Sequence, residues 1–270
     1  MPSCCRRAGD RPAASVTAPP RRRSVARSFE LLWSFRFEQR DPDRFYDLLS
    51  RDAVALLAQR IPLEGILAVD VGAGAGYLTR ALRAGGARCL PVDADLAELS
   101  WRGPPPAGAV LADARCLPLA PGSADLVVSS NVLEHVADPY GVIEEMARVL
   151  RANGHMWLSF TNWYGPWGGH ETSPWHYLGG DRARRHYVSR TGHAPKNVFG
   201  QSLFALHVGE VLGYLSAHPL LDVVDARPRY LPEVARALVR VPLVREVATW
   251  NLEILARKRS LRADLERCRA

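Results

Sequence analysis

The chain has 270 residues, enough for one large domain with its own hydrophobic core. Hydrophobic residues make up 47% of it and the formal net charge is +7, values that exclude a fibrous or wholly disordered protein. The positive charge sits at the ends: residues 1–28 hold seven Arg and one Asp, and residues 257–270 hold five Arg, one Lys and two acids. The segment between them is slightly acidic, which argues against a nucleic-acid-binding face on the folded domain.

The two ends are expected to lie outside that domain. Residues 1–27 are rich in Pro, Ala, Ser and Arg without apolar periodicity, so we predict a disordered basic arm there and a basic tail at 259–270. The arm has no apolar core and is not a secretory signal, although its composition also fits an organellar transit peptide. Both ends also suit peripheral contact with acidic lipid head groups. No apolar run approaches the roughly 18 residues of a transmembrane helix.

Cysteine and arginine usage suggest the compartment and the source. There are five Cys without a C-x-x-C pair, which favours a reducing cytoplasm. The 33 Arg against only two Lys are typical of a GC-rich coding sequence, and therefore of a bacterial protein.

Two helices are predicted before the first strand. In residues 28–60 apolar side chains recur at helical spacing, and Asp41-Pro42 offers the second helix a cap followed by proline. Strands and helices then alternate, which predicts parallel pairing in a doubly wound α/β sheet. Among the helices, two are expected at 77–86 and 139–154. The expected strands are 65–72, 87–95, 109–114, 124–133, 155–162, 220–231 and 249–258.

The alternation breaks after the fifth strand. Residues 162–180 read NWYGPWGGHETSPWHYLGG, a run rich in glycine and large aromatics that is typical of a functional loop. Helices are expected at 181–190 and 201–217, and again over 232–248 between the last two strands.

A glycine-rich turn joins the first strand to the helix after it. Gly72, Gly74 and Gly76 alternate, whereas a dinucleotide fingerprint has G-x-G-x-x-G, and Tyr77 stands where its third glycine would fall. No Gly-Lys-Ser/Thr follows, so the turn is not a phosphate loop either. Asp70 just before the glycines would repel a pyrophosphate but attract a cationic ligand, and S-adenosylmethionine carries both an ammonium and a sulfonium.

The turn resembles motif I of the class I S-adenosylmethionine-dependent methyltransferases, and later landmarks agree in order and spacing over residues 60–162. The resemblance implies that Asp93 holds the ribose hydroxyls, with Asp95 as an alternative on the same face of the strand. It also implies that Asp113 meets the adenine amino group, that Ala114 offers a backbone N–H, and that Asn131 opens the loop lining the cleft. The implied cofactor-binding residues are Asp70, Gly72, Gly74, Gly76, Asp93, Ala94, Asp113, Ala114 and Asn131.

More narrowly, FRFEQRDPDRFYDLL, GGHETSPWHYLGG and GHAPKNVFGQSLFA resemble a branch of uncharacterised class I methyltransferases from high-GC bacteria, of the type 11 kind. That resemblance covers most of 29–255 and supplies no substrate. It implies a Rossmann-like, seven-stranded, mostly parallel sheet with N-terminal helices and an insertion after the fifth strand. The predicted domain of 28–258 comprises helices (28–60), a cofactor-binding core (61–161), an acceptor-side insertion (162–218) and the last two strands (219–258).

The methyl group is expected at the carboxyl ends of the central strands, where such sheets bind ligands. We predict O-methylation of a small molecule or of a lipid- or glycan-linked acceptor, with His170 or His176 as general base and His135 behind them. The aromatics of 162–180 either wall the acceptor pocket or simply close the core over the fifth strand. The predicted pocket residues are Asn162, Trp163, Trp167, Trp175 and Tyr177.

His170, Glu171 and His176 carry side chains that can ligate zinc, but no metal is expected, because the H-E-x4-H spacing is not helical and Pro174 interrupts it. SNVLEH after the fourth strand differs from the Asn/Asp-Pro-Pro-Tyr/Phe of base and glutamine methyltransferases, so no nucleic-acid partner is expected. Three other functions stay open: an RNA methyltransferase, a non-catalytic cofactor-binding protein and, disfavoured by the glycine spacing, an NAD-dependent oxidoreductase. The oligomeric state is left open.

Overall fold

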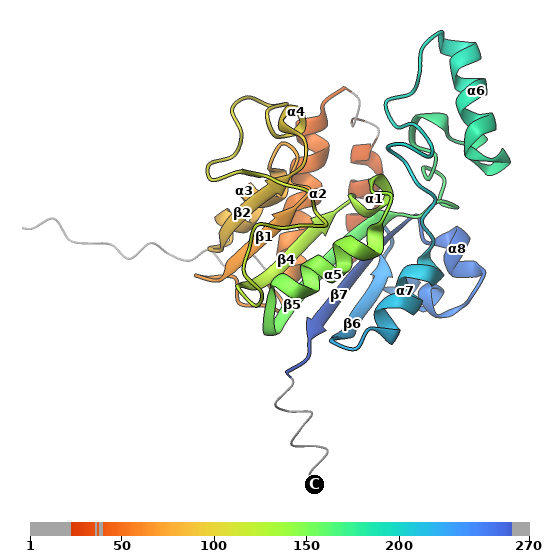
Figure 1. Cartoon of the computed structure of the whole chain (residues 1–270). Coiled ribbons are helices and arrows are strands. Elements are labelled where there is room, and N and C mark those ends of the chain that lie inside the picture. The colour runs from red at the N-terminus through yellow and green to blue at the C-terminus, as the bar shows by residue number, and fades with distance from the viewer. Residues whose placement is uncertain (1–22, 36, 38–39, 261–270) are drawn as a thin grey trace, which may run out of the picture.

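A single seven-stranded sheet organises the protein, with helices on both of its faces (Figure 1). The structure, a computed structural model, describes residues 23–35, 37 and 40–260. The strand order is β3-β2-β1-β4-β5-β7-β6, and β7 alone runs antiparallel to its neighbours. This confirms the predicted doubly wound, mostly parallel α/β fold. The strands are β1 (Leu67–Val71), β2 (Arg88–Asp93), β3 (Val110–Leu111), β4 (Ala124–Ser130), β5 (Leu150–Thr161), β6 (Leu221–Pro228) and β7 (Asn251–Lys258).

The central strands are apolar on both faces because helices cover both. On one face Val127 belongs to a buried cluster that includes Met146 of α5 (Pro139–Val149) and Val211 of α7 (Val208–Ala217). On the other face Leu126 packs with residues of α2 (Pro42–Leu57) and α3 (Tyr77–Ala84). Near-continuous apolar strands are the expected sequence of a sheet buried in this way.

The N-terminal helices are α1 (Val25–Phe35) and α2, and Asp41 caps α2 as predicted by accepting the Arg44 N–H at 3.3 Å. Helix α1 begins inside the segment that was predicted as a disordered arm. Arg27 is buried there against Asp52 of α2, so an ion pair orders the last residues of that segment. The rest of the predicted arm, residues 1–22, and the tail from 261 lie outside the described residues.

Helix α5 ends five residues earlier than predicted. The chain becomes extended at Leu150, which is buried and pairs with Ala124 of β4 before the ladder shifts register. Asn153, with φ of +63°, therefore lies within β5 and does not end a helix. Burial of Leu150 in the sheet outweighs the local helical periodicity that ran through 139–154.

Between β5 and α7 the chain forms short turns and one exposed helix. These are η2 (His170–Thr172), η3 (Trp175–Leu178) and α6 (Gly180–Thr191), and α6 stands apart from the sheet at the upper right of Figure 1. Helix α7 starts seven residues later than predicted, because residues before it bond to other segments: Phe204 N–H donates to the Glu134 carbonyl at 2.8 Å.

The remaining elements are short. The segment between β6 and β7 is helical as predicted, but it is divided into η4 (Glu233–Arg240) and α8 (Val244–Ala248). A single helical turn, α4 (Leu96–Leu99), follows β2, and η1 (Leu133–His135) follows β4. Among the described residues no helix is both long enough and apolar enough to cross a membrane.

Candidate active site

The glycine turn adopts a backbone that only glycine accepts readily. Gly72, Gly74 and Gly76 have φ of +74°, +48° and +75°, all in the left-handed region. A Cβ on Gly72 would stand 2.2 Å from a methyl of Val132, so the turn packs directly against the segment after β4. A Cβ on Gly74 would meet nothing within 4 Å, so this is where the turn faces open space.

Asp70 supports the turn from beneath. Its carboxylate is buried and accepts the Thr79 hydroxyl at 2.6 Å, in the first turn of α3. Burial raises the pKa of Asp70 to about 6, against the opposing effect of the Thr79 hydrogen bonds. An ionised Asp70 next to the N-terminus of α3 is favoured by the helix dipole and adds negative potential below the ligand side of the turn.

Asp93 lies at the end of β2 and contacts the glycine turn. One of its carboxylate oxygens accepts the Gly74 N–H at 2.8 Å, and the other accepts the Asp95 N–H at 2.9 Å. Asp95, the alternative candidate, is exposed and caps α4 by accepting the Ala97 N–H at 2.7 Å. The exposed Ala94 stands between them. The geometry therefore favours Asp93 as the acid beside the turn.

The segment after β3 is tied to the same edge, because the Ala112 N–H donates to the Asp93 carbonyl at 2.9 Å. Asp113 is exposed and forms an ion pair with Arg115 at 2.6 Å. The Arg115 bonds lower the pKa of Asp113 to about 2, so this carboxylate is ionised at neutral pH. Ala114 is half-buried between these two residues.

Asn131 directs the chain across the carboxyl end of β4. Its φ of +57° is a left-handed conformation that Asn tolerates better than most residues. Its N–H donates to the Ser159 carbonyl at 2.8 Å, and its side-chain oxygen accepts the Asn251 amide at 2.9 Å. Because these bonds place Val132 against Gly72, the residues of η1 lie beside the glycine turn.

Two of the three candidate histidines meet here. The rings of His135 and His170 lie edge to face with centroids 5.0 Å apart. His135 donates from Nδ1 to the Ser202 carbonyl at 2.7 Å, so Nε2 carries the lone pair of the neutral ring. Burial lowers the pKa of His170, and the neighbouring His135 adds to that effect. His170 itself has a left-handed φ of +48°.

His176 has a different environment. It is buried, bonds through Nε2 to the Gly165 carbonyl at 3.2 Å, and packs edge to face on Trp163. Burial lowers the pKa of His176. These contacts describe a histidine that organises the segment around it. Glu171, which lies between His170 and His176 in the H-E-x4-H sequence, accepts a hydrogen bond from the Asn197 side-chain amide at 2.9 Å.

The predicted pocket residues divide between core and surface. Asn162 is fully buried, and its amide donates to the Thr249 carbonyl at 3.0 Å, so it joins β5 to the segment before β7 and does not face a cavity. Trp163 is buried against Phe199. In contrast, Trp175 and Tyr177 are 40% and 49% exposed.

Trp167 packs between residues far from it in the sequence. Its ring lies 4.4 Å from that of Phe35 in α1 and 5.2 Å from that of Trp250, measured between centroids. These contacts fit the alternative in which aromatics of this segment close the core, because a tryptophan held on two sides presents little free ring surface.

A buried arginine that the sequence did not single out lies beneath this region. The Arg229 guanidinium donates to the hydroxyls of Ser159 at 2.7 Å and Ser130 at 3.0 Å, and lies over the Trp157 ring. Desolvation lowers its pKa. Arg27 donates to the Arg229 carbonyl at 2.9 Å, which connects α1 to this layer. Neither periodicity nor motif spacing marks a residue whose partners are this distant.

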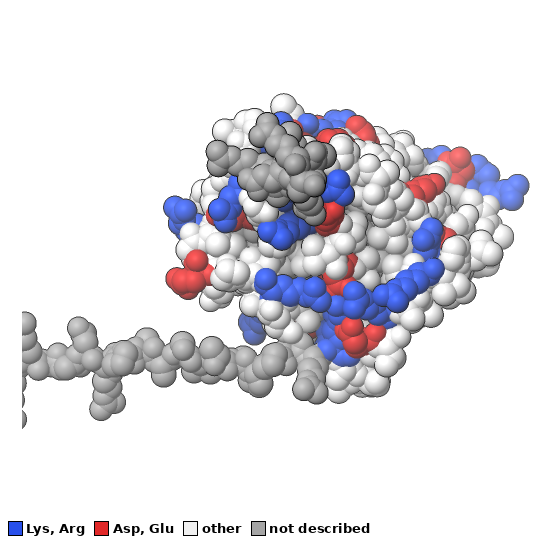
Figure 2. Space-filling model, turned by 90° about the horizontal axis from the view of Figure 1, so that it is seen from below, with Lys and Arg blue, Asp and Glu red and all other residues white. Residues whose placement is uncertain are grey.

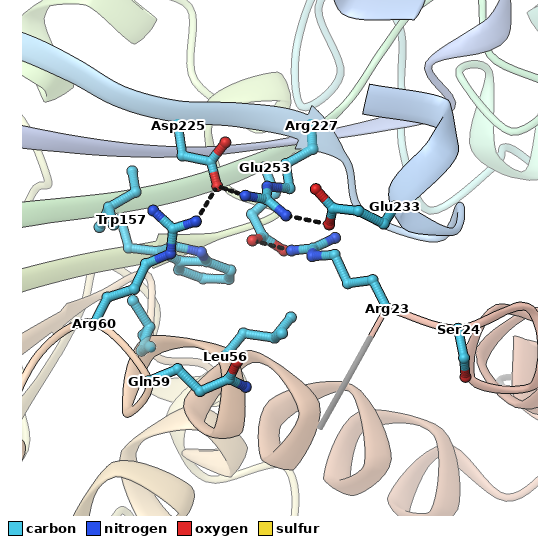
Figure 3. Close-up of a pocket in the computed structure, with 12 residues that line it drawn as sticks. Arg23, Ser24, Leu56, Gln59, Arg60, Trp157, Asp225, Arg227, Glu233 and Glu253 are labelled. Carbon is cyan, nitrogen blue, oxygen red and sulfur yellow. Dashed lines mark hydrogen bonds and ion pairs between the residues drawn. The ribbon is translucent and has the colours of Figure 1, made fainter. Parts of the chain in front are cut away.

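A cavity of about 430 Å³ lies elsewhere, between α2 and the strands β5 to β7 (Figure 3). Ion pairs line it: Arg60 meets Asp225 at 3.1 Å, and Arg23 pairs with Glu253. None of the predicted cofactor, acceptor or catalytic residues contributes to its wall. The candidate site residues lie at the carboxyl edge of the sheet and not in this cavity.

The strand order, the glycine turn after β1 and the acid after β2 together define a class I S-adenosylmethionine-dependent methyltransferase. Comparison with known proteins agrees. Residues 69–158 match the family model of a methyltransferase domain. A protein of Mycolicibacterium gilvum described as an uncharacterized methyltransferase is 43% identical over 246 residues, which cover 87% of this chain and 96% of the relative.

A second relative, from Mycobacteroides abscessus and described in the same words, is 41% identical over 251 residues, covering 88% of this chain and 96% of its own. The chain belongs to this family of bacterial methyltransferases. Among solved structures, an S-adenosylmethionine-dependent methyltransferase of Mesorhizobium loti superposes with a TM-score of 0.53 at 21% identity, covering 77% of this chain and 97% of that one. That likeness concerns the fold alone.

Proposed function

We propose that this methyltransferase binds S-adenosylmethionine along the glycine turn and methylates a hydroxyl of a small-molecule acceptor held beside His135 and His170. The observation that carries the proposal is the contact of Val132 with Gly72, because His135 belongs to the turn that Val132 begins and its ring packs against that of His170. Gly74 leaves open space on the ligand side, and Asp93 lies beside it.

The cofactor residues have separate roles in this proposal. Asp93 accepts hydrogen bonds from the ribose hydroxyls while it keeps its bond to the Gly74 N–H. Asp113 and the Ala114 N–H receive the adenine, and the buried Asp70 favours the cationic end of the cofactor through its field rather than by contact. Asn131 and Ala94 line the same edge.

S-adenosylmethionine supplies an electrophilic methyl group on a sulfonium. The acceptor oxygen attacks the methyl carbon in line, so an O–C bond forms while the C–S bond breaks and its electron pair stays on sulfur. The hydroxyl proton passes to an imidazole. His135 Nε2 can accept it, because Nδ1 of the same ring already donates its hydrogen to the Ser202 carbonyl. Holding the acceptor in line contributes most to the rate enhancement, since the sulfonium already provides a good leaving group.

A small acceptor is favoured over a nucleic acid. Residues 29–256 carry a slightly acidic net charge, whereas a nucleic-acid-binding face is expected to be basic. Figure 2 views the molecule from below, on the side away from the carboxyl edge of the sheet, where basic side chains form a band with acidic side chains above and below it. Retardation of transfer or ribosomal RNA by the protein in a gel-shift assay would contradict this acceptor class.

Cofactor binding is tested by thermal unfolding with S-adenosylhomocysteine, which stabilises the folded state by about 2.7 kcal/mol at 100 times its Kd. Asp93→Ala should lose roughly 1.5–3 kcal/mol of binding free energy, the range for hydrogen bonds to a charged group. Asp95→Ala is the matched control: it removes the cap of α4 but should leave binding unchanged. Equal stabilisation by NAD would overturn the cofactor assignment.

The acceptor side is tested by turnover with a panel of hydroxyl compounds. His135→Ala and His170→Ala should each lower the rate, by about 10²–10⁴-fold where the residue takes the proton. His176→Ala should act mainly on stability, because its ring is buried in the loop. Full activity in both His135→Ala and His170→Ala would show that alignment alone carries the reaction.

A further inference from the structure

Three side chains that could ligate a metal converge between η1 and η2. Glu134, His135 and His170 each offer one ligand atom, and these atoms all lie within 4.8 Å of one another. Glu134 and His135 are neighbours in the turn after β4, whereas His170 comes from the loop after β5. Glu171 and His176, which are near His170 in the sequence, do not belong to this cluster.

The carboxylate of Glu134 provides a second, independent observation. Its side chain is buried, with 1% of its surface exposed. One oxygen accepts the Thr161 N–H at 2.9 Å, but the other is buried without a hydrogen-bond partner among the residues that the structure describes. A buried carboxylate oxygen without a partner costs free energy, and a bound cation removes that cost.

The histidines are arranged as metal ligands often are. A ligating imidazole usually donates its other N–H to a carbonyl or carboxylate, which fixes the ring and the tautomer. His135 does so toward the Ser202 carbonyl, which leaves Nε2 free to bind. His170 Nδ1 lies 3.5 Å from the Gly168 carbonyl, close to the distance at which that bond would form.

We propose that Glu134, His135 and His170 bind one divalent transition-metal ion such as Zn²⁺. Two imidazoles and one carboxylate suit Zn²⁺ and its neighbours in the first row, whereas Mg²⁺ and Ca²⁺ prefer sets made of oxygen alone. Three protein ligands leave a coordination position open, as catalytic zinc sites do. Glu134 and His135 lie in η1, whose N-cap Val132 contacts Gly72, so the cluster lies at the edge of the sheet where the methyl group is expected.

One consequence rests on the proposed function. An ion at this position would bind the acceptor hydroxyl and lower the pKa of that hydroxyl, so the proton would leave to solvent before the oxygen attacks the methyl carbon. The two imidazoles would then act as ligands and no longer as bases. Metal binding itself needs neither cofactor nor acceptor, so it is measured in the absence of both.

The test uses the full-length protein after treatment with a chelator. Co²⁺ is titrated with its visible absorption as the signal, and Zn²⁺ is titrated by calorimetry. We expect one ion per chain, without competition from excess Mg²⁺. His170→Asn and Glu134→Gln should each weaken binding by about tenfold to 100-fold or more. Asn tolerates the left-handed backbone of position 170, and Gln keeps an acceptor for the Thr161 N–H.

His193→Asn is the matched control, since it removes an exposed imidazole outside the cluster and should leave the affinity unchanged. Circular dichroism shows whether each variant is folded. If His170→Asn does not fold, Glu134→Gln alone provides the test. The proposal is overturned if the wild-type chain binds no ion. It is also overturned if His170→Asn and Glu134→Gln both bind the ion as tightly as the wild-type chain does. S-adenosylhomocysteine binding, measured on the same samples, separates the outcomes: if it persists without metal binding, the cofactor assignment stands and the metal site does not.

Discussion

The two halves of the carboxyl edge of the sheet are built differently. On the cofactor side the contacts are short in sequence: Thr79 bonds Asp70 nine residues away, and Gly74 bonds Asp93 at a separation of 19. On the acceptor side they are long. His135 meets Ser202 across 67 residues, and Asn162 meets Thr249 across 87.

The difference also concerns the kind of interaction. The cofactor side depends on the backbone of three glycines, and their alternate spacing can be recognised in the sequence. The acceptor side depends on buried polar side chains, such as Arg229 with its two serines and Arg27 with Asp52. A cofactor site can therefore be identified from one stretch of sequence, whereas the acceptor site requires the whole fold. The predictions that follow test this contrast.

The largest effect is expected on the acceptor side. Arg27→Met leaves the buried Asp52 without its guanidinium and should lower the free energy of unfolding by about 3–5 kcal/mol, as breaking a buried pair does. Arg51→Met breaks an exposed pair with Asp47 and should cost less than about 1 kcal/mol. Urea denaturation measures both. Equal costs would mean that buried polar contacts do not hold this side together.

The glycine turn should separate folding from binding. Gly72→Ala combines a left-handed backbone with a collision at Val132, and should cost about 2–4 kcal/mol of folding free energy. Gly74→Ala meets no neighbour, so only the backbone term of about 1–2 kcal/mol applies. We nevertheless expect Gly74→Ala to lose S-adenosylhomocysteine affinity, because its methyl enters the space proposed for the ligand. Denaturation with and without S-adenosylhomocysteine measures both the stability and the affinity of each variant. Unchanged affinity in Gly74→Ala would show that the ligand does not occupy this space.

Asp70 should make stability depend on pH. Its pKa is about 6 in the folded protein and 3.8 ordinarily, so between these values the folded state holds the proton that the unfolded state has lost. The contribution of Asp70 to stability therefore falls as pH rises from about 4 to 6 and stays low above that. Asp70→Asn removes this cost and should stabilise the protein at pH 8 by on the order of 2 kcal/mol relative to its effect at pH 4.

The same variant should lose more affinity for S-adenosylmethionine than for S-adenosylhomocysteine, because both carry the ammonium but only the former carries the sulfonium charge. Thr79→Val removes the hydroxyl that lowers the pKa of Asp70, so it should steepen the pH dependence. A flat stability profile in the wild-type chain would show that Asp70 is not held as described.

The smallest effect is expected at Asp113. Its pair with Arg115 is exposed, so Arg115→Gln should leave the melting temperature and the affinity for S-adenosylhomocysteine nearly unchanged at pH 7, where Asp113 stays ionised. Asp113→Ala should weaken the affinity without changing the melting temperature. If Arg115→Gln alone weakens the affinity, the arginine is part of the adenine site.

The sequence predicted the glycine turn and the strand that carries Asp93 because their signals are local. Alternate glycines after a buried strand indicate a left-handed turn, and Asp93 follows the next strand by parallel geometry. The seven strands were also predicted, and the central strands β1, β4 and β5 bury short apolar runs. The end of α5 was misplaced because Leu150 pairs with Ala124, a contact that helical periodicity does not register.

The acceptor side was decided by tertiary structure. The sequence favoured His170 and His176 as the base, with His135 behind them, and only the fold brought His135 and His170 together with Glu134 and enclosed His176 in the loop. It likewise made Asn162 a buried link to Thr249, and brought Arg229 beneath the ends of β4 and β5. Backbone conformation follows from neighbouring residues, but a buried hydrogen bond between segments a hundred residues apart exists only once the sheet has placed both ends of it.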